Sequence, residues 1–171
     1  LSTCNRTEVY AVAERFHHAF AAVNQFLADL GGMTVDELTA HVFAHHDAAA
    51  AAHLFDVAAG LDSAVIGETE ILGQVRQAWD VARDSGTCRN RLNLLFRAAI
   101  ETGKRVRTET GISRGTSSVS HAAVEMLADE VGELAGKRVL VIGAGSMGEG
   151  VAIALAKAAL SNTVVELLPL V

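Results

Sequence analysis

Apolar residues recur at helical spacing through most of this chain. Phe20, Val23, Leu27 and Leu30 lie three or four positions apart, which predicts a helix that ends at Gly31-Gly32. By the same criterion, further helices are predicted over residues 48–59, 66–83, 89–108 and 119–131. The chain is therefore expected to be largely helical up to about residue 131.

Local signals refine this picture for the first 110 residues. Thr34 to Glu37 match a capping box for a short helix, and Asp47 is placed to cap the helix over 48–59. Residues 8–13 have the composition of a short strand. These elements indicate a mixed α/β domain with too few strands to close a sheet, so its first strands are expected to precede Leu1.

The pattern changes near Gly136. Residues 138–142 form a compact apolar strand, the glycine-rich segment 143–148 follows, and a helix is predicted to about residue 160. A second strand is possible at 163–168. This order is that of an opening βαβ unit of a nucleotide-binding domain, and completing such a domain takes roughly 100 residues more. The fold class is predicted as α/β, with a catalytic domain over 1–110, a connecting helix over 111–135 and an incomplete Rossmann domain over 136–171.

Composition and charge narrow the function classes. Half of the 171 residues are hydrophobic, which is enough for a core. No apolar run reaches the roughly 18 residues of a membrane span, and no export signal is present, so a cytoplasmic location is expected. The net charge is −6, yet the segment from Arg89 to Arg114 holds seven basic and two acidic residues. That segment could face phosphates, although a solvated helix face is the favoured interpretation.

The glycine-rich segment carries the first candidate chemistry. Gly143, Gly145 and Gly148 follow a G-x-G-x-x-G pattern between a strand and a helix, which permits close backbone approach to a pyrophosphate. The predicted cofactor-binding residues are Gly143, Ala144, Gly145, Ser146, Met147 and Gly148. A merely tight strand-to-helix turn is the alternative. Glu166 is a poor ribose ligand because apolar residues follow it, so the choice between NAD and NADP stays open.

Two cysteines, far apart and without C-x-x-C spacing, are expected to be free thiols. Cys4 lies in a polar loop beside Arg6, and a nearby cation favours the nucleophilic thiolate. Cys88 also has a basic neighbour, Arg89. Position alone does not rank the two, and an inert thiol is the alternative for both.

The seven histidines raise the question of a metal site. His41, His45 and His46 form the tightest group, but no further ligand is evident, so surface histidines and no metal site are expected. His53 differs, because it lies on a helix face that leads to the polar turn containing Ser63. A structural role and a role in a site are both open for it.

Several ordered motifs together resemble those of one family. They are Ser2-Thr-Cys-Asn-Arg-Thr-Glu8, Gly60-Leu-Asp-Ser-Ala-Val-Ile-Gly-Glu68, Ile71-Leu-Gly-Gln-Val75, Gly115-Thr-Ser-Ser-Val119 and the glycine-rich segment 143–148. In order and spacing they resemble the glutamyl-tRNA reductases over residues 1 to about 160. Glu68-Thr69-Glu70 stands where that family commonly has Glu-Pro-Gln, and the tail from Ser161 does not resemble it.

The resemblance implies a fold and a reaction. The fold is a ferredoxin-like α+β catalytic domain joined to a Rossmann domain that binds NADPH. The reaction is attack by Cys4 on glutamyl-tRNA to form a thioester, then reduction to glutamate-1-semialdehyde, the first step of tetrapyrrole synthesis. His53 matches a histidine important for activity. The implied substrate contacts are Thr3, Asn5, Arg6, Ser63, Glu68, Thr69, Glu70 and Gln74, with Arg6 suited to bind the glutamate carboxylate.

The resemblance also implies partners and leaves alternatives. Partners would be glutamyl-tRNA, a second copy of the chain and glutamate-1-semialdehyde aminomutase. The family's upstream strands, the rest of its nucleotide domain and its dimerisation region are not in residues 1–171, so a monomer or an aggregate is expected for this piece. A small-molecule dehydrogenase and a noncatalytic tRNA- or partner-binding fragment remain the competing hypotheses.

Overall fold

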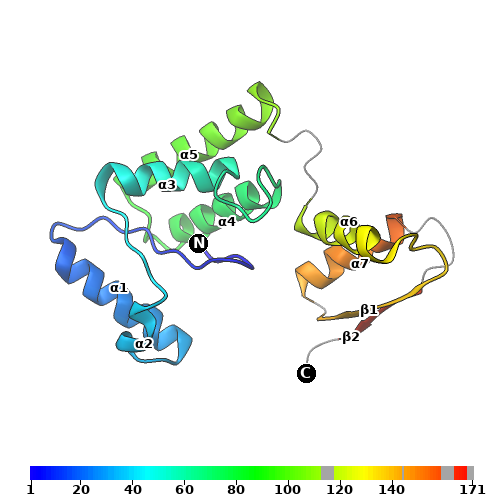
Figure 1. The fold of residues 1–171 in the computed structure, drawn as a ribbon. Coiled ribbons are helices and arrows are strands. Elements are labelled where there is room, and N and C mark those ends of the chain that lie inside the picture. The colour runs from blue at the N-terminus through cyan, green and yellow to red at the C-terminus, as the bar shows by residue number, and fades with distance from the viewer. Residues whose placement is uncertain (113–117, 144, 159–163, 169–171) are drawn as a thin grey trace.

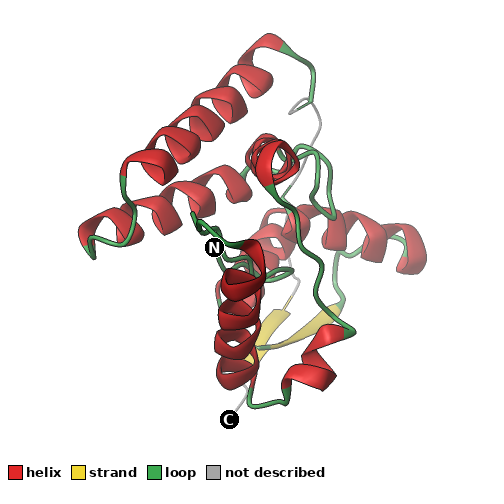
Figure 2. Cartoon of the chain, turned by 90° about the vertical axis from the view of Figure 1, so that its left-hand side faces the viewer, coloured by secondary structure: helices red, strands yellow, loops and turns green. Residues whose placement is uncertain are grey.

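The computed structural model describes residues 1–112, 118–143, 145–158 and 164–168. Its elements are α1 (Phe16–Gly31), α2 (Val35–Thr39), α3 (Asp47–Ala59), α4 (Glu70–Asp84), α5 (Asn90–Glu109), α6 (Val119–Val131), β1 (Arg138–Ile142), α7 (Ser146–Ala158) and β2 (Val164–Leu168). Figure 1 shows α1 to α5 on one side and the remaining elements on the other. Figure 2 shows how strongly helix outweighs strand. The predicted helices and the strand at 138–142 are confirmed.

The first hydrophobic core lies where α3, α4 and α5 pack together. Its buried residues are Leu54, Val57, Ala58, Ile71, Val75, Phe96, Ala99 and Ile100. Each helix contributes residues three or four positions apart, as an amphipathic helix does. Gly103 lets α5 approach α3 closely, because a Cβ there would lie 2.5 Å from the carbonyl oxygen of Ala58. This core supports the segments that carry the motifs of the first 75 residues.

A second core lies between α6, α7 and β1. It is formed by Val124, Leu134, Ala154 and Leu155, with Val139 and Val141 of β1 packed against them. β1 and β2 pair in parallel, from Arg138 opposite Val164 to Ile142 opposite Leu168. A parallel pair needs a crossover connection, which α7 provides. The strand, helix and strand expected from the sequence are present, and membership of a Rossmann domain stays a prediction.

Three local predictions were wrong. Residues 8–13 form no strand, because the described part of the chain offers them no partner strand; only Ser2 and Thr7 form a β-bridge nearby. The fourth helix begins at Glu70 rather than at residue 66, since Gly67 has a left-handed φ of 80°. Asp47 is the first residue of α3 and makes no capping bond.

The predicted capping box, in which Thr34 and Glu37 bond each other's backbone nitrogen, is confirmed. With no sheet among residues 1–112, the ferredoxin-like arrangement stays a prediction.

Candidate functional site

The loop that carries Cys4 is the tip of a narrow hairpin. The backbone nitrogen of Glu8 donates to the carbonyl of Leu1, and Thr3 N donates to Arg6 O at 2.9 Å. Oγ1 of Thr3 accepts bonds from the backbone nitrogens of Asn5 and Arg6, both at 3.1 Å. Threonine is suited to such turns because its hydroxyl bonds backbone groups two or three residues on. Cys4 is thereby held exposed at the tip of the hairpin.

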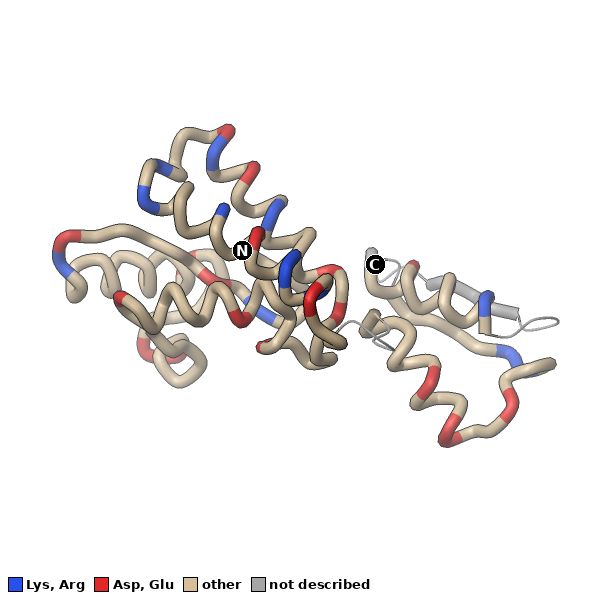
Figure 3. Tube along the Cα trace, turned by 90° about the horizontal axis from the view of Figure 1, so that it is seen from above, with Lys and Arg blue, Asp and Glu red and all other residues tan. Residues whose placement is uncertain are grey.

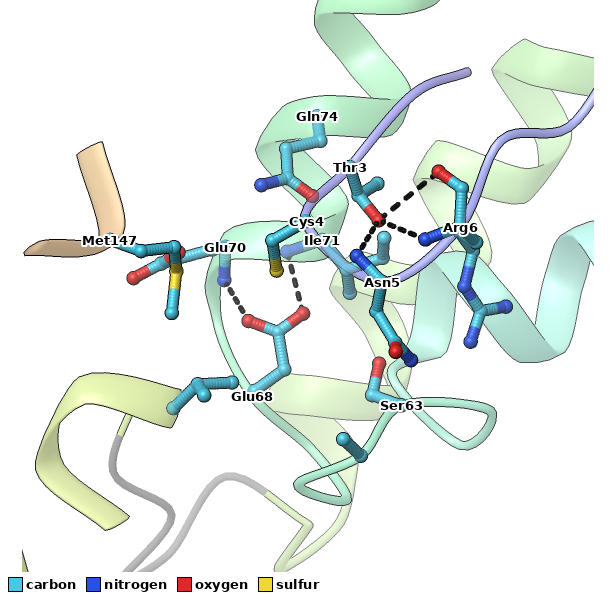
Figure 4. A pocket seen from close by; sticks show the side chains of 12 residues that line it. Thr3, Cys4, Asn5, Arg6, Ser63, Glu68, Glu70, Ile71, Gln74 and Met147 are labelled. Carbon is cyan, nitrogen blue, oxygen red and sulfur yellow. Dashed lines mark hydrogen bonds between the residues drawn. The ribbon is translucent and has the colours of Figure 1, made fainter. Parts of the chain in front are cut away.

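A cavity of about 300 Å³, which we call the thiol pocket, lies around this loop (Figure 4). It is lined by Thr3, Cys4, Asn5, Arg6, Ser63, Ala64, Glu68, Glu70, Ile71, Gln74, Val119 and Met147. In Figure 4 the sulfur of Cys4 points toward Glu68, and the guanidinium of Arg6 lies beyond Asn5. The first 75 residues and the glycine-rich segment thus both contribute to its lining.

Glu68 caps α4 from inside the thiol pocket. Its two carboxylate oxygens accept bonds from the backbone nitrogens of Glu70 at 2.7 Å and Ile71 at 2.8 Å. The residue is only 6% exposed. A carboxylate at a helix N-terminus satisfies otherwise unpaired N–H groups and is favoured by the helix dipole. Glu68 therefore fixes the start of α4, a contribution that the sequence analysis did not anticipate.

Arg6 is the centre of a polar cluster behind the pocket, here called the Arg6 network and consisting of Arg6, Glu8, Tyr10, His53 and Asp62. Nη1 of Arg6 donates to Glu8 Oε1 at 3.2 Å and to Asp62 Oδ2 at 2.7 Å, and Nη2 donates to the carbonyl of Asp62. Nε2 of His53 lies 2.9 Å from Glu8 Oε1, and Tyr10 donates to Glu8 Oε2 at 2.7 Å. The hairpin is thus bonded to α3 and to the turn after it.

The bonding of Arg6 leaves one edge of its guanidinium available. A guanidinium has five N–H groups in a rigid plane, and Glu8 and Asp62 occupy three of them. The other two, on Nε and Nη2, have no hydrogen-bond partner among the described residues. Because Asp62 bonds Nη1 and Nη2, the free groups form the neighbouring edge. Such an edge can bind a carboxylate through two parallel bonds.

The Arg6 network also shifts the pKa values of its members. Burial raises the pKa of Glu8, but the hydrogen bonds from Tyr10 and His53 and the charges of His53 and Arg6 outweigh it and lower that pKa. Burial lowers the pKa of Arg6, and Asp62 and Glu8 outweigh it and raise that pKa. Burial and the bond to Glu8 strongly raise the pKa of Tyr10. Glu8 and Arg6 are therefore charged at neutral pH, and Tyr10 keeps its proton.

The turn between α3 and α4 is closed by two glycines. Gly67 N donates to Gly60 O at 2.8 Å, and both glycines have left-handed φ angles. Arg107 of α5 ties the turn down, since Nη1 donates to Ala58 O at 2.7 Å and Nη2 to Glu68 O at 3.0 Å. A cation at the end of α3 also complements that helix's dipole. Asp62 and Ser63 lie on a turn fixed at both ends.

The glycine-rich segment brings Gly148 into close contact with Gly143 between β1 and α7. Gly143 has a φ of 110°. A Cβ on Gly148 would lie 1.7 Å from the carbonyl oxygen of Gly143, so no other residue fits there. Ser146 begins α7, whose N–H groups could face an anion. These residues fit a dinucleotide, although Ala144 and the side chain of Ser146 lie outside the described residues.

The structure brings together most, not all, of the predicted site residues. Those that line the thiol pocket are Thr3, Cys4, Asn5, Arg6, Ser63, Glu68, Glu70, Gln74 and Met147. Thr69 is exposed outside it, and His53 lines a separate cavity, bonded to Glu8. Sequence reasoning missed Glu8, Tyr10 and Asp62. Glu8 and Asp62 lie within the motifs that carry the resemblance and Tyr10 does not, and no motif reveals the contacts that these residues make with one another.

The remaining candidates from the sequence, which are Cys88, a metal site and the basic stretch, do not form a second site among the described residues. Cys88 is buried and donates weakly to Asn93 Oδ1 at 3.4 Å. Within the described residues, no three histidine, cysteine or acidic side chains could hold a metal ion, and no helix is long and apolar enough to cross a membrane. In the basic stretch Arg97 and Arg105 pair with glutamates one turn away. Figure 3 shows basic residues interspersed with acidic ones over the helices.

Comparison with known proteins identifies the family. Residues 1–110 match the family model described as the N-terminal domain of glutamyl-tRNAGlu reductase. The chain belongs to the glutamyl-tRNA reductase family. The family's N-terminal region therefore includes the Cys4 hairpin, the Arg6 network and helices α1 to α5.

Two curated reductases and one solved structure are similar to this chain. Glutamyl-tRNA reductase 1 of a Nocardioides species is 46% identical over 147 residues, covering 86% of this chain and 34% of the relative. Glutamyl-tRNA reductase of Pelotomaculum thermopropionicum is 48% identical over 149 residues, covering 87% and 34%. A solved structure of glutamyl-tRNA reductase from Methanopyrus kandleri has a TM-score of 0.47 and 46% identity, over 71% of this chain and 31% of that one. The chain spans about a third of the length of these curated reductases.

Proposed function

We propose that this chain carries the acyl-accepting site of a glutamyl-tRNA reductase, in which Cys4 takes the glutamyl group from glutamyl-tRNA. The observation that carries the proposal is the pairing of two features in one pocket. One is the exposed thiol of Cys4, and the other is Arg6 with a free carboxylate-binding edge. Once glutamate is esterified to tRNA, its side-chain carboxylate remains free and can bind Arg6 while the ester lies near the sulfur.

The first half-reaction needs only this chain and its substrate. The thiolate of Cys4 attacks the ester carbonyl carbon, a C–S bond forms, and the C–O bond to the terminal ribose breaks. The ribose oxygen leaves and takes up the proton that the Cys4 thiol had released, giving a thioester and free tRNA. Thr3 keeps the hairpin tip in shape for this attack, and Glu68 fixes the α4 terminus beneath the sulfur. A held geometry of this kind lowers the entropic cost of the reaction.

The second half-reaction is reduction, which makes the whole protein an oxidoreductase of tetrapyrrole synthesis. Gly143 to Gly148 would hold the pyrophosphate of NADPH, whose chemistry is to supply a hydride to the thioester. The products would then be glutamate-1-semialdehyde, NADP⁺ and the regenerated Cys4 thiolate. A second copy of the chain, and an aminomutase that takes the reactive aldehyde onward, are the proposed partners.

Intact mass measurement after an acid quench tests the first half-reaction. The purified chain is mixed with glutamyl-tRNA in the absence of NADPH, and folding is checked by circular dichroism. A single glutamyl adduct is expected. Cys4→Ser should reduce adduct formation by about a thousandfold or more, because an alcohol replaces the thiolate nucleophile. The matched variant Cys88→Ser should keep the adduct, since Cys88 is buried away from the pocket.

Each other outcome identifies what is wrong. An adduct that survives Cys4→Ser would assign the nucleophile to another residue. A folded chain that binds glutamyl-tRNA but forms no adduct would favour the noncatalytic, tRNA-binding hypothesis. An adduct that forms equally from a small-molecule glutamyl ester would remove the need for tRNA and favour the small-molecule alternative.

A further inference from the structure

Two carboxylates that are not among the implied substrate contacts bind the cation of the thiol pocket. Asp62 binds Arg6 through both its side chain and its backbone carbonyl. Glu8 shares its Oε1 between Arg6 and His53. Arg6 and Glu8 are nearly enclosed, with side chains 17% and 12% exposed. The side chain of His53 is similarly enclosed, whereas that of Asp62 is 52% exposed, so Asp62 holds Arg6 from the solvent side of the network.

This arrangement poses a physical problem. A lone arginine would attract an anionic substrate by charge, whereas two neighbouring carboxylates cancel that attraction and repel the substrate. What they provide instead is orientation, since they hold one edge of the guanidinium and leave the other free. His53 contacts both carboxylates, because its Nε2 lies 2.9 Å from Glu8 Oε1 and its Nδ1 lies 3.8 Å from Asp62 Oδ2. Tyr10 fixes the remaining oxygen of Glu8.

We infer that Asp62 and Glu8 are positioning residues that make the thiol pocket selective for an acyl group ending in a carboxylate, because they hold Arg6 with its Nε–Nη2 edge free. His53 and Tyr10 act through Glu8 and do not touch the substrate. This inference rests on the proposed function and names the residues that determine its substrate class. Selectivity arises because an amide presents an N–H₂ group where Arg6 needs a second acceptor.

The experiment compares two substrates that differ only in that group. The rate of Cys4 acylation is measured with glutamyl-tRNA and with the same tRNA carrying glutamine, in a Cys88→Ser background. A carboxylate preference of about a hundredfold or more is expected for the unchanged network. Asp62→Asn should reduce this ratio about tenfold or more, mainly by slowing the glutamyl reaction, and Asp62→Glu should restore part of it. The circular dichroism spectrum should stay unchanged, which a general loss of structure would not allow.

Two further variants keep the test decisive. Asp56→Asn removes an exposed carboxylate from the same helix as His53 and should leave the ratio unchanged. Tyr10→Phe removes only the bond to Glu8 Oε2 and retains the ring contact with Phe96 at 5.4 Å. It should lower the ratio a few-fold even if Asp62→Asn does not fold.

The possible results separate the two proposals. If folded Asp62→Asn keeps the full ratio, or reacts faster with glutamyl-tRNA as simple charge attraction predicts, the positioning role is overturned. An unchanged ratio in Tyr10→Phe would overturn the role of Tyr10 through Glu8. If the unchanged network accepts both substrates equally, the inference fails while the proposed acylation stands. If neither substrate acylates Cys4, the proposed function fails and takes this inference with it.

Discussion

The two parts of the described chain build their candidate sites by different means. In residues 1–112 the site is held by side chains, since Arg6 reaches Glu8 and Asp62, and Arg107 reaches the carbonyls of Ala58 and Glu68. In the part from α6 to β2 the backbone itself makes the site. Gly148 lies so close to Gly143 that no Cβ fits between them.

This difference determines how each site should respond to mutation. A side-chain network can lose a member and still fold, with a change in what it binds. A backbone turn that excludes a single methyl group fails as a unit, because the strand and helix on either side depend on it. Substitutions in the first part should therefore alter selectivity, and substitutions in the second should alter folding of β1 and α7.

The largest expected effect is that of Gly148→Ala. The added Cβ would overlap the carbonyl oxygen of Gly143, at 1.7 Å in the present geometry, so the turn between β1 and α7 must open. We expect a loss of about 3 kcal/mol in the stability of the α6–β2 part. Trp79, the single tryptophan, lies in α4. Its fluorescence should therefore report an unchanged transition for the first part while circular dichroism shows the loss.

Gly145→Ala is the matched control for this substitution. A Cβ at Gly145 meets no atom within 4 Å, so stability should change little. A Gly148→Ala variant as stable as this control would show that the close approach is not what the turn requires. A shift of the Trp79 transition in Gly148→Ala would show instead that the two parts unfold together.

A smaller effect of the same kind is expected within the first part. Gly103→Ala would place a Cβ 2.5 Å from the carbonyl oxygen of Ala58 and 3.0 Å from Leu72. Moving α3 and α5 apart should lower the free energy of unfolding by about 2 kcal/mol.

Gly73→Ala is the matched control, because it lies inside α4 with no atom within 4 Å of the new Cβ. It should raise the free energy of unfolding by about 0.5–1 kcal/mol through helix propensity. Urea unfolding followed by Trp79 fluorescence measures both, and equal effects would refute the close-packing argument.

Local sequence patterns predicted the elements well where local physics dominates. The helix at Val119–Val131 and the strand at Arg138–Ile142 have the expected bounds, because apolar periodicity and flanking glycines define them. The α4 boundary was wrong because Gly67 needs a left-handed conformation, which no hydrophobic pattern reveals. Residues 8–13 failed for another reason, since a strand depends on a partner that may lie anywhere in the chain.

The candidate site could be predicted only in part. Its motifs identified Cys4 and Arg6, and the structure places both in one pocket. The bond between Arg6 and Asp62 spans 56 positions, and no spacing rule connects residues so far apart. His53 shows the same limit: its sequence position suggested the site, whereas its ring bonds Glu8 outside the thiol pocket. Domain boundaries and individual site roles stay predictions.

The smallest expected effect is a loss of stability at low pH, when Glu8 becomes protonated. The folded pKa of Glu8 is lowered from its usual 4.5, so its contribution to stability is present above that value and is lost as pH falls through the folded pKa. Thermal unfolding followed by Trp79 fluorescence between pH 6 and pH 3 should show this loss, of about 1 kcal/mol for a bonded carboxylate. Glu8→Gln should be less stable at pH 6 and should approach the unsubstituted chain near pH 3. Glu14→Gln, which removes an exposed carboxylate just before α1, should follow the unsubstituted chain throughout.

A constant difference between Glu8→Gln and the unsubstituted chain would mean that the amide disturbs packing and that the charge of Glu8 does not hold the Arg6 network together. The selectivity of the first part would then need a source other than its ionised carboxylates.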